Sequence, residues 1–269
     1  MSAPCGVELT VVGSINLDFT ARLERLPRPG ETLTAHQLVR TPGGKGANQA
    51  VAAARLGAKV TMVGAVGDDD LADEALAVLL EERITLEVER KGQTGVALIY
   101  VDAEGENEIA VFPGANAEIT PRVVSGAVLC QLEVPDEVVY AAAAGADFFA
   151  LNAAPARVLD LEPDLLVVNQ LEHETVTRGK LVAVTYGKDG AALFENGREV
   201  ARCTPPTIVA QDGTAAGDAF TAALLVMLLE GASRERALQV ACVAGAWAAS
   251  IVGAQSSLPR ADEVALWLD

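Results

Sequence analysis

Short apolar runs rich in β-branched residues alternate with helix-compatible segments along much of the chain, and this alternation limits the folds open to it. The first run, VELTVVGS, ends in the glycine and serine that follow a buried first strand. Later runs of this kind are AKVTMVGAVG, AVLCQLE, DFFALN, LLVVN and KLVAVTYG. The pattern predicts an α/β fold with a mostly parallel central sheet covered by helices on both faces.

Two stretches predict a small second sheet inserted among these units. Residues 19–40 alternate polar and apolar side chains around a turn at Pro29 and Gly30. Residues 94–112 hold two strand-like runs joined by DAEGEN, which indicates a hairpin. We expect these stretches to form a lid beside the main sheet. Because the sequence has no repeat, low-complexity tract or linker, residues 1–269 are predicted to form one domain.

Helix signals fill the remaining segments. GANQAVAAARL has high helix propensity and stops at Gly57, and DDDLADEALAVLLEE is amphipathic with acids in its first turn. The last third of the chain is predicted to be helical over residues 217–230, over residues 233–250 and in the closing RADEVALWL. Before it, ALFENGREVARC predicts a hairpin whose Asn196-Gly197 pair suits a type I′ turn.

The charge balance argues against polyanionic partners. Lys and Arg number 20 against 37 Asp and Glu, a net charge of -17, so we expect a small-molecule ligand and neither nucleic acid nor a membrane surface. The longest apolar runs fall short of the ~20 residues of a membrane span, and the N-terminus lacks a signal-peptide pattern. Four cysteines without a C-x-x-C pair predict reduced thiols in a cytoplasmic protein.

The stretch TPGGKGANQA, residues 41–50, has the look of a phosphate-binding loop but fits neither common form. Gly46 stands after Lys45 where a Walker A loop needs Ser or Thr, and no G-x-G-x-x-G fingerprint can be placed on it. Glycines that expose backbone, with Lys45 and Asn48 as donors, favour a polyhydroxylated ligand. The alternative is a tight turn into a packed helix.

A second stretch, DGTAAGDAFTAALL, places small residues at the start of an apolar helix. The free N–H groups of such a start lie at the positive end of the helix dipole and can bind an anion. Asp218, in the first turn, could accept a proton from a hydroxyl in phosphoryl transfer, a reaction that depends more on positioning than on a strong base. A plain N-cap with an acid in the first turn is the alternative.

A third feature is GSINLD, which follows the first predicted strand. Asn16 and Asp18 are two positions apart, so on an extended segment they face the same way and could bind adjacent hydroxyls of one sugar. Ligands of open α/β sheets bind at the carboxyl ends of strands, which agrees with this position. A turn-forming Asn/Asp pair is the alternative.

These motifs, with PGET, TGVALI, GANA, QLE, NAAPAR, TYGKDG and GAQSSLP, occur in an order that closely resembles the ribokinase-like, PfkB-type carbohydrate kinases. The resemblance covers nearly the whole chain. It implies a ribokinase-like three-layer sandwich with an inserted β lid at about residues 19–40 and 94–112. It also answers the question raised by the glycine-lysine stretch, because in this family that motif belongs to the sugar site.

The resemblance implies a role for each matching residue. Sugar hydroxyls would be held by Asn16, Asp18, Gly43, Gly44, Lys45, Asn48 and Glu133, with Ala97 and Ile99 closing over the sugar. Asp218 would be the base, and Ala215, Ala216 and Gly217 would form the anion hole. Asn169, Thr185, Gly187 and Gly217 would contact the nucleotide and its phosphates, Glu172 the Mg²⁺, and Asp212, Thr214, Gly253 and Ser257 a K⁺.

The implied activity is Mg²⁺-dependent transfer of the γ-phosphoryl group of ATP to the 5-hydroxyl of D-ribose, supported by K⁺. The chain departs from the family where only HETVTRGK separates Glu172 from the next strand, in place of one or more helical segments. This shortening motivates one alternative, a sugar- or nucleotide-binding relative with weak catalysis or none. A kinase of another sugar or a nucleoside is the other alternative, because one hydroxyl more or less can redirect such a site. An apolar lid face would be covered by pairing of two lids, so we expect a homodimer.

Overall fold

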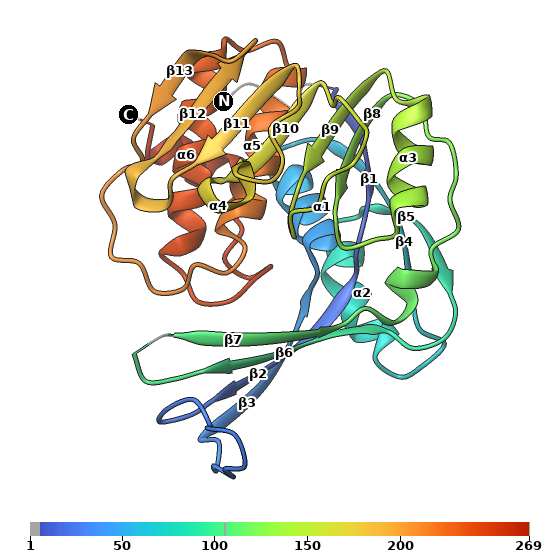
Figure 1. Ribbon diagram of the computed structural model, residues 1–269, viewed down its shortest axis with the longest axis vertical. Coiled ribbons are helices and arrows are strands. Elements are labelled where there is room, and N and C mark those ends of the chain that lie inside the picture. Colours follow the sequence, from blue (N-terminus) through green and yellow to red (C-terminus); the bar gives the residue numbers. More distant parts are fainter. Residues whose placement is uncertain (1–5, 105, 269) are drawn as a thin grey trace.

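The computed structural model describes residues 6–104 and 106–268, and its centre is a nine-stranded sheet (Figure 1). The strand order is β13-β12-β11-β10-β9-β8-β1-β4-β5, and all neighbours are parallel except the pairs β11–β12 and β12–β13. The strands are β1 (Glu8–Val12), β4 (Lys59–Val66), β5 (Thr85–Arg90), β8 (Ala127–Gln131), β9 (Phe148–Asn152), β10 (Leu165–Asn169), β11 (Leu181–Thr185), β12 (Ala191–Glu195) and β13 (Arg198–Cys203). The predicted mostly parallel α/β fold is confirmed.

Two apolar cores lie on the two faces of this sheet, which is why its strands read as continuous apolar runs. One core packs under helices α1 (Lys45–Arg55), α2 (Ala72–Glu81), α5 (Ala216–Leu229), α6 (Arg234–Ala249) and α7 (Ala261–Leu266). The other core packs under α3 (Asp136–Gly145), and loop residues Leu159, Leu161 and Val176 extend it over β9 to β11. The shortened segment after Glu172 therefore leaves this second layer with loops instead of further helices.

A separate four-stranded sheet projects from the body as the predicted lid (Figure 1). Its order is β3-β2-β6-β7, formed by β2 (Asn16–Arg22), β3 (Gln37–Gly43), β6 (Gly95–Val101) and β7 (Asn107–Phe112). β2 pairs with β3 as an antiparallel hairpin and with β6 in parallel. Because β2 begins at Asn16 and β3 ends at Gly43, the candidate sugar-binding motifs belong to the lid strands themselves.

The predicted turn at Asn196-Gly197 and the predicted end of α1 agree with the structure, whereas the start of α2 and strand β5 do not. Asn196 and Gly197 both have positive φ (52° and 73°), as the predicted type I′ turn requires, and Gly57 follows α1 with φ 103°. The helix predicted over residues 68–82 starts only at Ala72. Strand β5 was not predicted, because its sequence TLEVER carries three charged residues and lies at the sheet edge, exposed on one side.

Two further observations concern expected partners. Cys130, Cys203 and Cys242 are free cysteines, while Cys5 lies outside the described residues. Among the described helices none has the length and apolarity needed to cross a membrane.

Helix α1 begins where its backbone touches the end of β1, and this contact should limit substitution at Gly46. A Cβ at Gly46 would lie 2.6 Å from backbone atoms of Gly13 and Ser14. We therefore expect Gly46→Ala to lower the free energy of unfolding by about 1–3 kcal/mol, as overpacking does. Helix propensity alone predicts the opposite sign. Thermal and urea unfolding of Gly46→Ala measure it, with Gly213→Ala, where a Cβ meets no atom within 4 Å, as the control. An unchanged Gly46→Ala protein would contradict the contact.

Candidate active site

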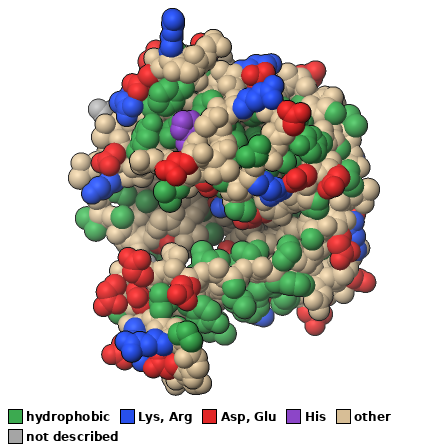
Figure 2. All heavy atoms as spheres, viewed as in Figure 1, with side chains coloured by type: hydrophobic (Ala, Val, Ile, Leu, Met, Phe, Trp, Pro, Cys, Tyr) green, Lys and Arg blue, Asp and Glu red, His purple; other side chains and the backbone are tan. Residues whose placement is uncertain are grey.

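A cavity of about 390 Å³ lies between the lid sheet and the carboxyl ends of the body strands, and a hollow separates these two parts of the molecule in Figure 2. Most residues singled out from the sequence line it: Asn16, Asp18, Gly44, Lys45, Asn48, Ala97, Ile99, Glu133, Asn169, Glu172, Thr185, Thr214, Ala215, Gly217 and Asp218. Gly43, Gly187, Asp212, Ala216, Gly253 and Ser257 are not part of the lining. The fold thus brings motifs from both ends of the chain to one cavity.

The glycine-lysine motif forms the turn from lid strand β3 into α1. Gly44 has φ 88°, a conformation that favours glycine, and a Cβ at Gly43 would collide with the Asp18 carboxylate. The glycines therefore let the chain turn sharply beside a buried acid, and the helix start brings Lys45 and Asn48 to the cavity wall.

Glu133, just past β8, is fixed by donors from two other elements. Its Oε2 accepts hydrogen bonds from Ser14 Oγ (2.6 Å) and from the backbone N–H of Lys45 (3.1 Å), and its Oε1 lies 4.0 Å from Lys45 Nζ. Burial by itself would lower the pKa of Lys45, but the carboxylates of Asp218, Glu133, Glu172 and Asp18 raise it above its usual value. Lys45 is therefore a cation held among acids.

Asn16 and Asp18 both point from β2 into the cavity, as their spacing predicts. Asn16 Oδ1 accepts a hydrogen bond from Asn116 Nδ2 (2.8 Å), which leaves its own amide N–H groups for a ligand. Asp18 Oδ1 is buried and has no hydrogen-bond partner among the described residues. Burial first, and then the nearby carboxylates of Glu133 and Asp218, raise the pKa of Asp18 to about 7 against the opposing charge of Lys45. A buried acceptor without a donor is a site prepared for a ligand hydroxyl.

Asp218 lies in the first turn of α5, 6% exposed, and both of its oxygens are bound. Asn48 Nδ2 donates to Oδ2 (2.9 Å) and Gln49 Nε2 donates to Oδ1 (2.8 Å). Burial raises the pKa of Asp218, while Lys45 and the two amide donors oppose this shift. The carboxylate is therefore oriented by α1 and made more basic than an exposed aspartate, which suits a proton acceptor.

The start of α5 offers backbone donors to the cavity. The N–H groups of Ala215, Gly217 and Asp218 donate to no acceptor in the described part of the chain, whereas Ala216 N–H is directed to the Gly213 carbonyl at 3.3 Å. Ala215 adopts a left-handed conformation (φ 60°), which costs an alanine about 1–2 kcal/mol. Strain of this kind at the helix start opens the N–H groups toward the cavity and supports the anion-hole hypothesis.

Asn169 and Glu172 bind each other instead of standing free. Asn169 Oδ1 accepts from Glu172 N and Glu172 Oε2 accepts from Asn169 N, both at 2.8 Å, which is a capping box at the start of the short helix α4 (Gln170–His173). Glu172 Oε1 takes no part in this cap. Mg²⁺ is commonly bound by one carboxylate oxygen together with waters and the phosphates of a ligand, so Glu172 Oε1 is a suitable protein ligand for it. The described residues contain no group of three or more His, Cys, Asp or Glu side chains that could hold a metal by themselves.

Asp212 joins the loop before α5 to the loop after α6. Its Oδ1 accepts from the N–H (2.9 Å) and the hydroxyl (2.6 Å) of Thr214, and its Oδ2 accepts from Gly253 N–H (2.9 Å). Burial opposes ionisation, but these hydrogen bonds outweigh it and hold the pKa of Asp212 below its usual value. Gln255, on the same loop, is buried with an unpartnered Oε1, and Ser257 is fully buried. The carboxylate and hydroxyl oxygens of these loops are ligands of the kind that a hard cation takes, and the buried Gln255 Nε2 on the same loop is an unpartnered donor among the described residues.

Several residues at or behind the cavity were not identified from the sequence. Asn107, Ile109 and Val111 reach the lining from lid strand β7, and Asn152 reaches it from the end of β9. Gln49 and Gln131 are completely buried behind the wall. The position of Asn152 at a strand end was a usable signal, but Gln49 lies inside a helical run with nothing to mark it.

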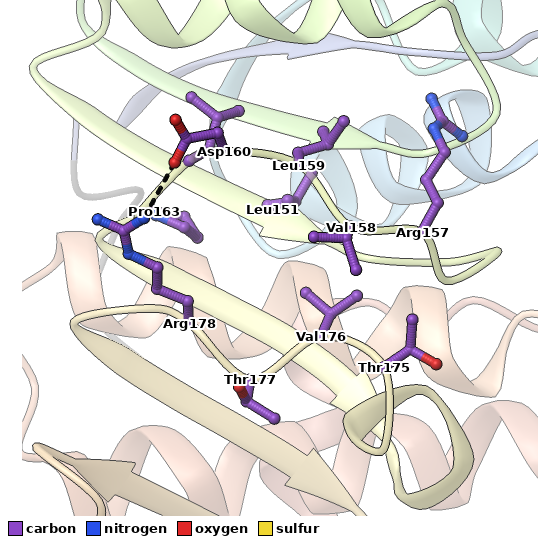
Figure 3. A pocket seen from close by; sticks show the side chains of 11 residues that line it. Leu151, Arg157, Val158, Leu159, Asp160, Pro163, Thr175, Val176, Thr177 and Arg178 are labelled. Carbon is purple, nitrogen blue, oxygen red and sulfur yellow. Dashed lines mark hydrogen bonds and ion pairs between the residues drawn. The ribbon is translucent and has the colours of Figure 1, made fainter.

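A second hollow, of about 250 Å³, lies away from these residues (Figure 3). It is bordered by Leu151 and the loops on the α3 side, with Val158 and Val176 facing each other and an ion pair between Asp160 and Arg178. No residue singled out from the sequence lines it. It marks the place where loops replace helices in the second layer.

The fold and the cavity define a phosphoryl-transfer enzyme of the carbohydrate kinase class, and the comparison with known families agrees. The model of the pfkB family carbohydrate kinases matches residues 8–159 and 135–261, so the chain belongs to this family. The expected resemblance is confirmed.

Several of the proteins that this chain is similar to are ribokinases. The chain is 36% identical to a ribokinase from Bacillus subtilis over 95% of this chain and 97% of the relative. It is similar to the crystal structure of a ribokinase from Thermotoga maritima (TM-score 0.85, 30% identity, 97% and 99% of the two chains). The structure of an Arabidopsis thaliana ribokinase complexed with ribose and ATP is similar too (TM-score 0.84, 29% identity, 98% and 99%).

The buried Asp18 should make stability depend on pH. Its pKa of about 7 lies above the ordinary 3.8, so this residue's contribution to folding is complete below pH 3.8 and is lost as pH rises through 7. Asp18→Asn removes that loss, and we expect its thermal midpoint to exceed that of the wild type by roughly 5 °C at pH 8 and by much less at pH 5. Scanning calorimetry measures both.

The matched control is Asp160→Asn, which changes an aspartate whose side chain is 94% exposed. It should shift the midpoint equally little at both pH values. A pH-independent midpoint difference in Asp18→Asn would contradict the role of burial.

Proposed function

We propose that the protein transfers the γ-phosphoryl group of ATP to the 5-hydroxyl of D-ribose. The observation that carries the proposal is the meeting, in one cavity, of the buried Asp218, the free N–H groups at the start of α5, and the polar side chains on the lid and α1. Membership of the carbohydrate kinase family supports the reaction class. A ribokinase that is 36% identical over 95% of this chain supports ribose as the acceptor.

The proposed sugar site uses acceptors and donors that the protein leaves unpaired. Asp18 Oδ1 and Asn48 Oδ1 are buried acceptors without a donor among the described residues, and each would accept a hydrogen bond from a sugar hydroxyl. The amide of Asn16, the ammonium of Lys45 and the carboxylate of Glu133 complete the polar wall, and Gly44 supplies close backbone. Gly43, behind the lining, leaves room for the Asp18 carboxylate. Ala97 and Ile99 on β6 present an apolar surface that would cover the sugar.

In the proposed reaction Asp218 Oδ2 accepts the proton of the 5-hydroxyl. The hydroxyl oxygen forms a bond to the γ-phosphorus while the bond from that phosphorus to the bridging oxygen breaks, and ADP leaves with the electron pair of that bond. The N–H groups of Ala215, Gly217 and Asp218 face the phosphoryl oxygens, where they stabilise the charge of the transition state.

The nucleotide would lie beside the ends of β10 and β11. Asn169 ends β10 and Thr185 ends β11, both at the cavity, and Gly187 follows β11 in a short turn. Glu172 Oε1 and, through waters, Asn169 would hold Mg²⁺ with the phosphates of ATP. When bound, this ion neutralises phosphate charge.

A K⁺ site is proposed at the loops tied together by Asp212. Asp212, Thr214, Gly253 and Ser257 would supply carboxylate, carbonyl and hydroxyl oxygens to it. A cation there lies behind the anion hole and would stiffen the loop that contains Gly213, a residue with full backbone freedom.

We also propose that the protein is cytoplasmic and forms a homodimer. The free Cys130, Cys203 and Cys242 fit a reducing cytoplasm, and the net charge of -17 disfavours a nucleic acid or an anionic membrane surface as a partner.

The lid face turned away from the cavity carries Leu38, Leu98, Tyr100 and Phe112, which are 38–66% exposed. Hydrophobic atoms are gathered along the lid in Figure 2. Pairing of two lids in a homodimer would cover this face.

Asp218→Asn tests the proposed reaction. Loss of the proton acceptor should lower kcat on D-ribose by at least ~100-fold, while KM for ribose changes little, because the amide keeps the shape of the carboxylate. Phosphate transfer from ATP in Mg²⁺ and K⁺ is measured across ribose, deoxyribose, fructose and nucleosides. If the wild type binds ribose without phosphorylating it, the protein is a sugar-binding protein and not a kinase. If another acceptor is phosphorylated faster than ribose, that acceptor is the substrate.

Leu98→Glu tests the proposed lid contact. A charge at the centre of the apolar lid face should convert a dimer into a monomer with an unchanged far-ultraviolet circular dichroism spectrum, measured by light scattering after size exclusion. Val158→Glu, at an exposed position (74%) on the α3 side, is the control and should stay dimeric. A monomeric wild type, or a dimeric Leu98→Glu protein, would contradict the contact.

A further inference from the structure

We propose that Gln49 is a positioning residue that fixes the Asp218 carboxylate for proton transfer. The inference rests on the proposed function and goes beyond it, because Gln49 does not line the cavity and would touch neither sugar nor nucleotide. Its side chain is completely buried in α1, directly behind Asp218. It binds the carboxylate oxygen that Asn48 leaves free.

A chain of hydrogen bonds sets the orientation of Gln49, starting from a backbone carbonyl. The carbonyl of Val167 accepts from Asn152 Nδ2 (3.2 Å). This bond turns Asn152 Oδ1 toward Gln49, whose Nε2 donates to it (2.9 Å). The same Nε2 donates its second hydrogen to Asp218 Oδ1 (2.8 Å). Because a carbonyl oxygen can only accept, the first bond determines the direction of every later one.

Gln131 closes the chain from the other side. Its Nε2 donates to Gln49 Oε1 (2.7 Å), the end of the amide that points away from the carboxylate, and this bond adds to an orientation that Asn152 and Asp218 already fix. Rotating the Gln49 amide by half a turn would set its oxygen against Asp218 Oδ1 and Asn152 Oδ1, and would leave two buried acceptors without donors. The cost of such unpaired groups is about 1–3 kcal/mol each, so a single orientation is populated.

This arrangement divides the two oxygens of Asp218 between two tasks. Asn48 lines the cavity and binds Oδ2, so Oδ2 is the oxygen on the cavity side and the one that would receive the hydroxyl proton. Gln49 binds Oδ1 on the far side and stops the carboxylate from rotating about its χ2 angle. Proton transfer to a fixed oxygen needs no reorganisation, which is the usual source of the rate advantage of a positioned base.

An uncharged donor also favours the ionised form of Asp218, because it lowers the pKa of this residue. Burial raises the pKa of Asp218 and the carboxylate of Glu133 adds to this, while Lys45, Asn48 and Gln49 lower it. Asp18 is a further acid on the same cavity wall, and Lys45 is the cation that faces the group from α1. Because an amide does not titrate in the working range of the enzyme, Gln49 supplies the same hydrogen bond at every pH at which the protein is folded.

The experiment compares two substitutions of Gln49 whose effects should depend on pH in opposite directions. Gln49→Met keeps the volume but removes a donor that lowers the pKa of Asp218, so kcat should fall by roughly 10- to 100-fold at the acidic end of the pH profile and by less as pH rises. Gln49→Glu can donate only while protonated, so its kcat should fall further as pH rises and the two carboxylates repel. KM for ribose should stay within about threefold of the wild-type value in both, since neither side chain reaches the cavity.

The matched control is Gln131→Met, the same substitution in an equally buried glutamine one hydrogen bond further from Asp218. It should lower kcat by less than about threefold, with a pH profile parallel to that of the wild type. Circular dichroism and thermal midpoints establish that each variant is folded, and Gln49→Glu, which preserves size and polarity, covers the case in which Gln49→Met fails to fold.

The outcomes separate this inference from the function on which it rests. If the wild type phosphorylates ribose, Asp218→Asn does not, and the two Gln49 variants show opposite pH trends, Gln49 is a positioning residue. Parallel pH profiles in the Gln49 variants, or a loss in Gln131→Met equal to that in Gln49→Met, would overturn the inference while leaving the kinase intact. No turnover by the wild type would overturn the proposed function instead.

Discussion

The close contact between the backbone of Gly13, at the end of β1, and that of Gly46, in the first turn of α1, is the constraint on which the site depends. A Cβ on Gly13 would lie 2.9 Å from the Gly46 Cα, so only two glycines permit the approach. The contact seats the start of α1 directly on the carboxyl end of β1. It thereby puts Lys45 beside Glu133, and Asn48 and Gln49 beside Asp218.

Burial of acids follows from this geometry and gives the cavity its chemistry. Asp18 and Asp218 are 7% and 6% exposed, and the cavity has one lysine on its wall to balance them. Their raised pKa values reflect a desolvation cost that the charge of Lys45 reduces for both acids, and that amide donors reduce further for Asp218, without cancelling it. A fold that kept these carboxylates exposed would be more stable, but its base would be weaker and less well oriented. The burial of these acids therefore lowers the stability of the protein, while it holds the reacting groups in position before the ligand binds, as is common at functional sites.

The shortened second layer shows how tolerant the scaffold is away from this contact. Between β9 and β11 the chain forms loops and the short helix α4, yet the strand order is kept, β10 pairs with β11 in regular parallel register, and Thr185 lines the cavity. Apolar loop residues such as Leu159, Leu161 and Val176 cover the face that helices would otherwise protect. The sheet is held by its own ladder and by the helices on the other face, so the loss of cover there need not disturb the site.

The sequence by itself determined the element types, the α/β class, the separate lid and the chemical character of the motifs, because these depend on local periodicity, turn residues and charge. It could also place Asn16 and Asp18 on one strand face. Only the tertiary structure decided that Gln49 meets Asp218 across 169 residues and that Asn152 orients it. It also decided that Ala216 N–H is bonded, while the N–H groups of Ala215 and Gly217 find no acceptor among the described residues. Hydrogen-bond direction and burial are properties of groups brought together by long-range packing, and no local pattern in the chain encodes them.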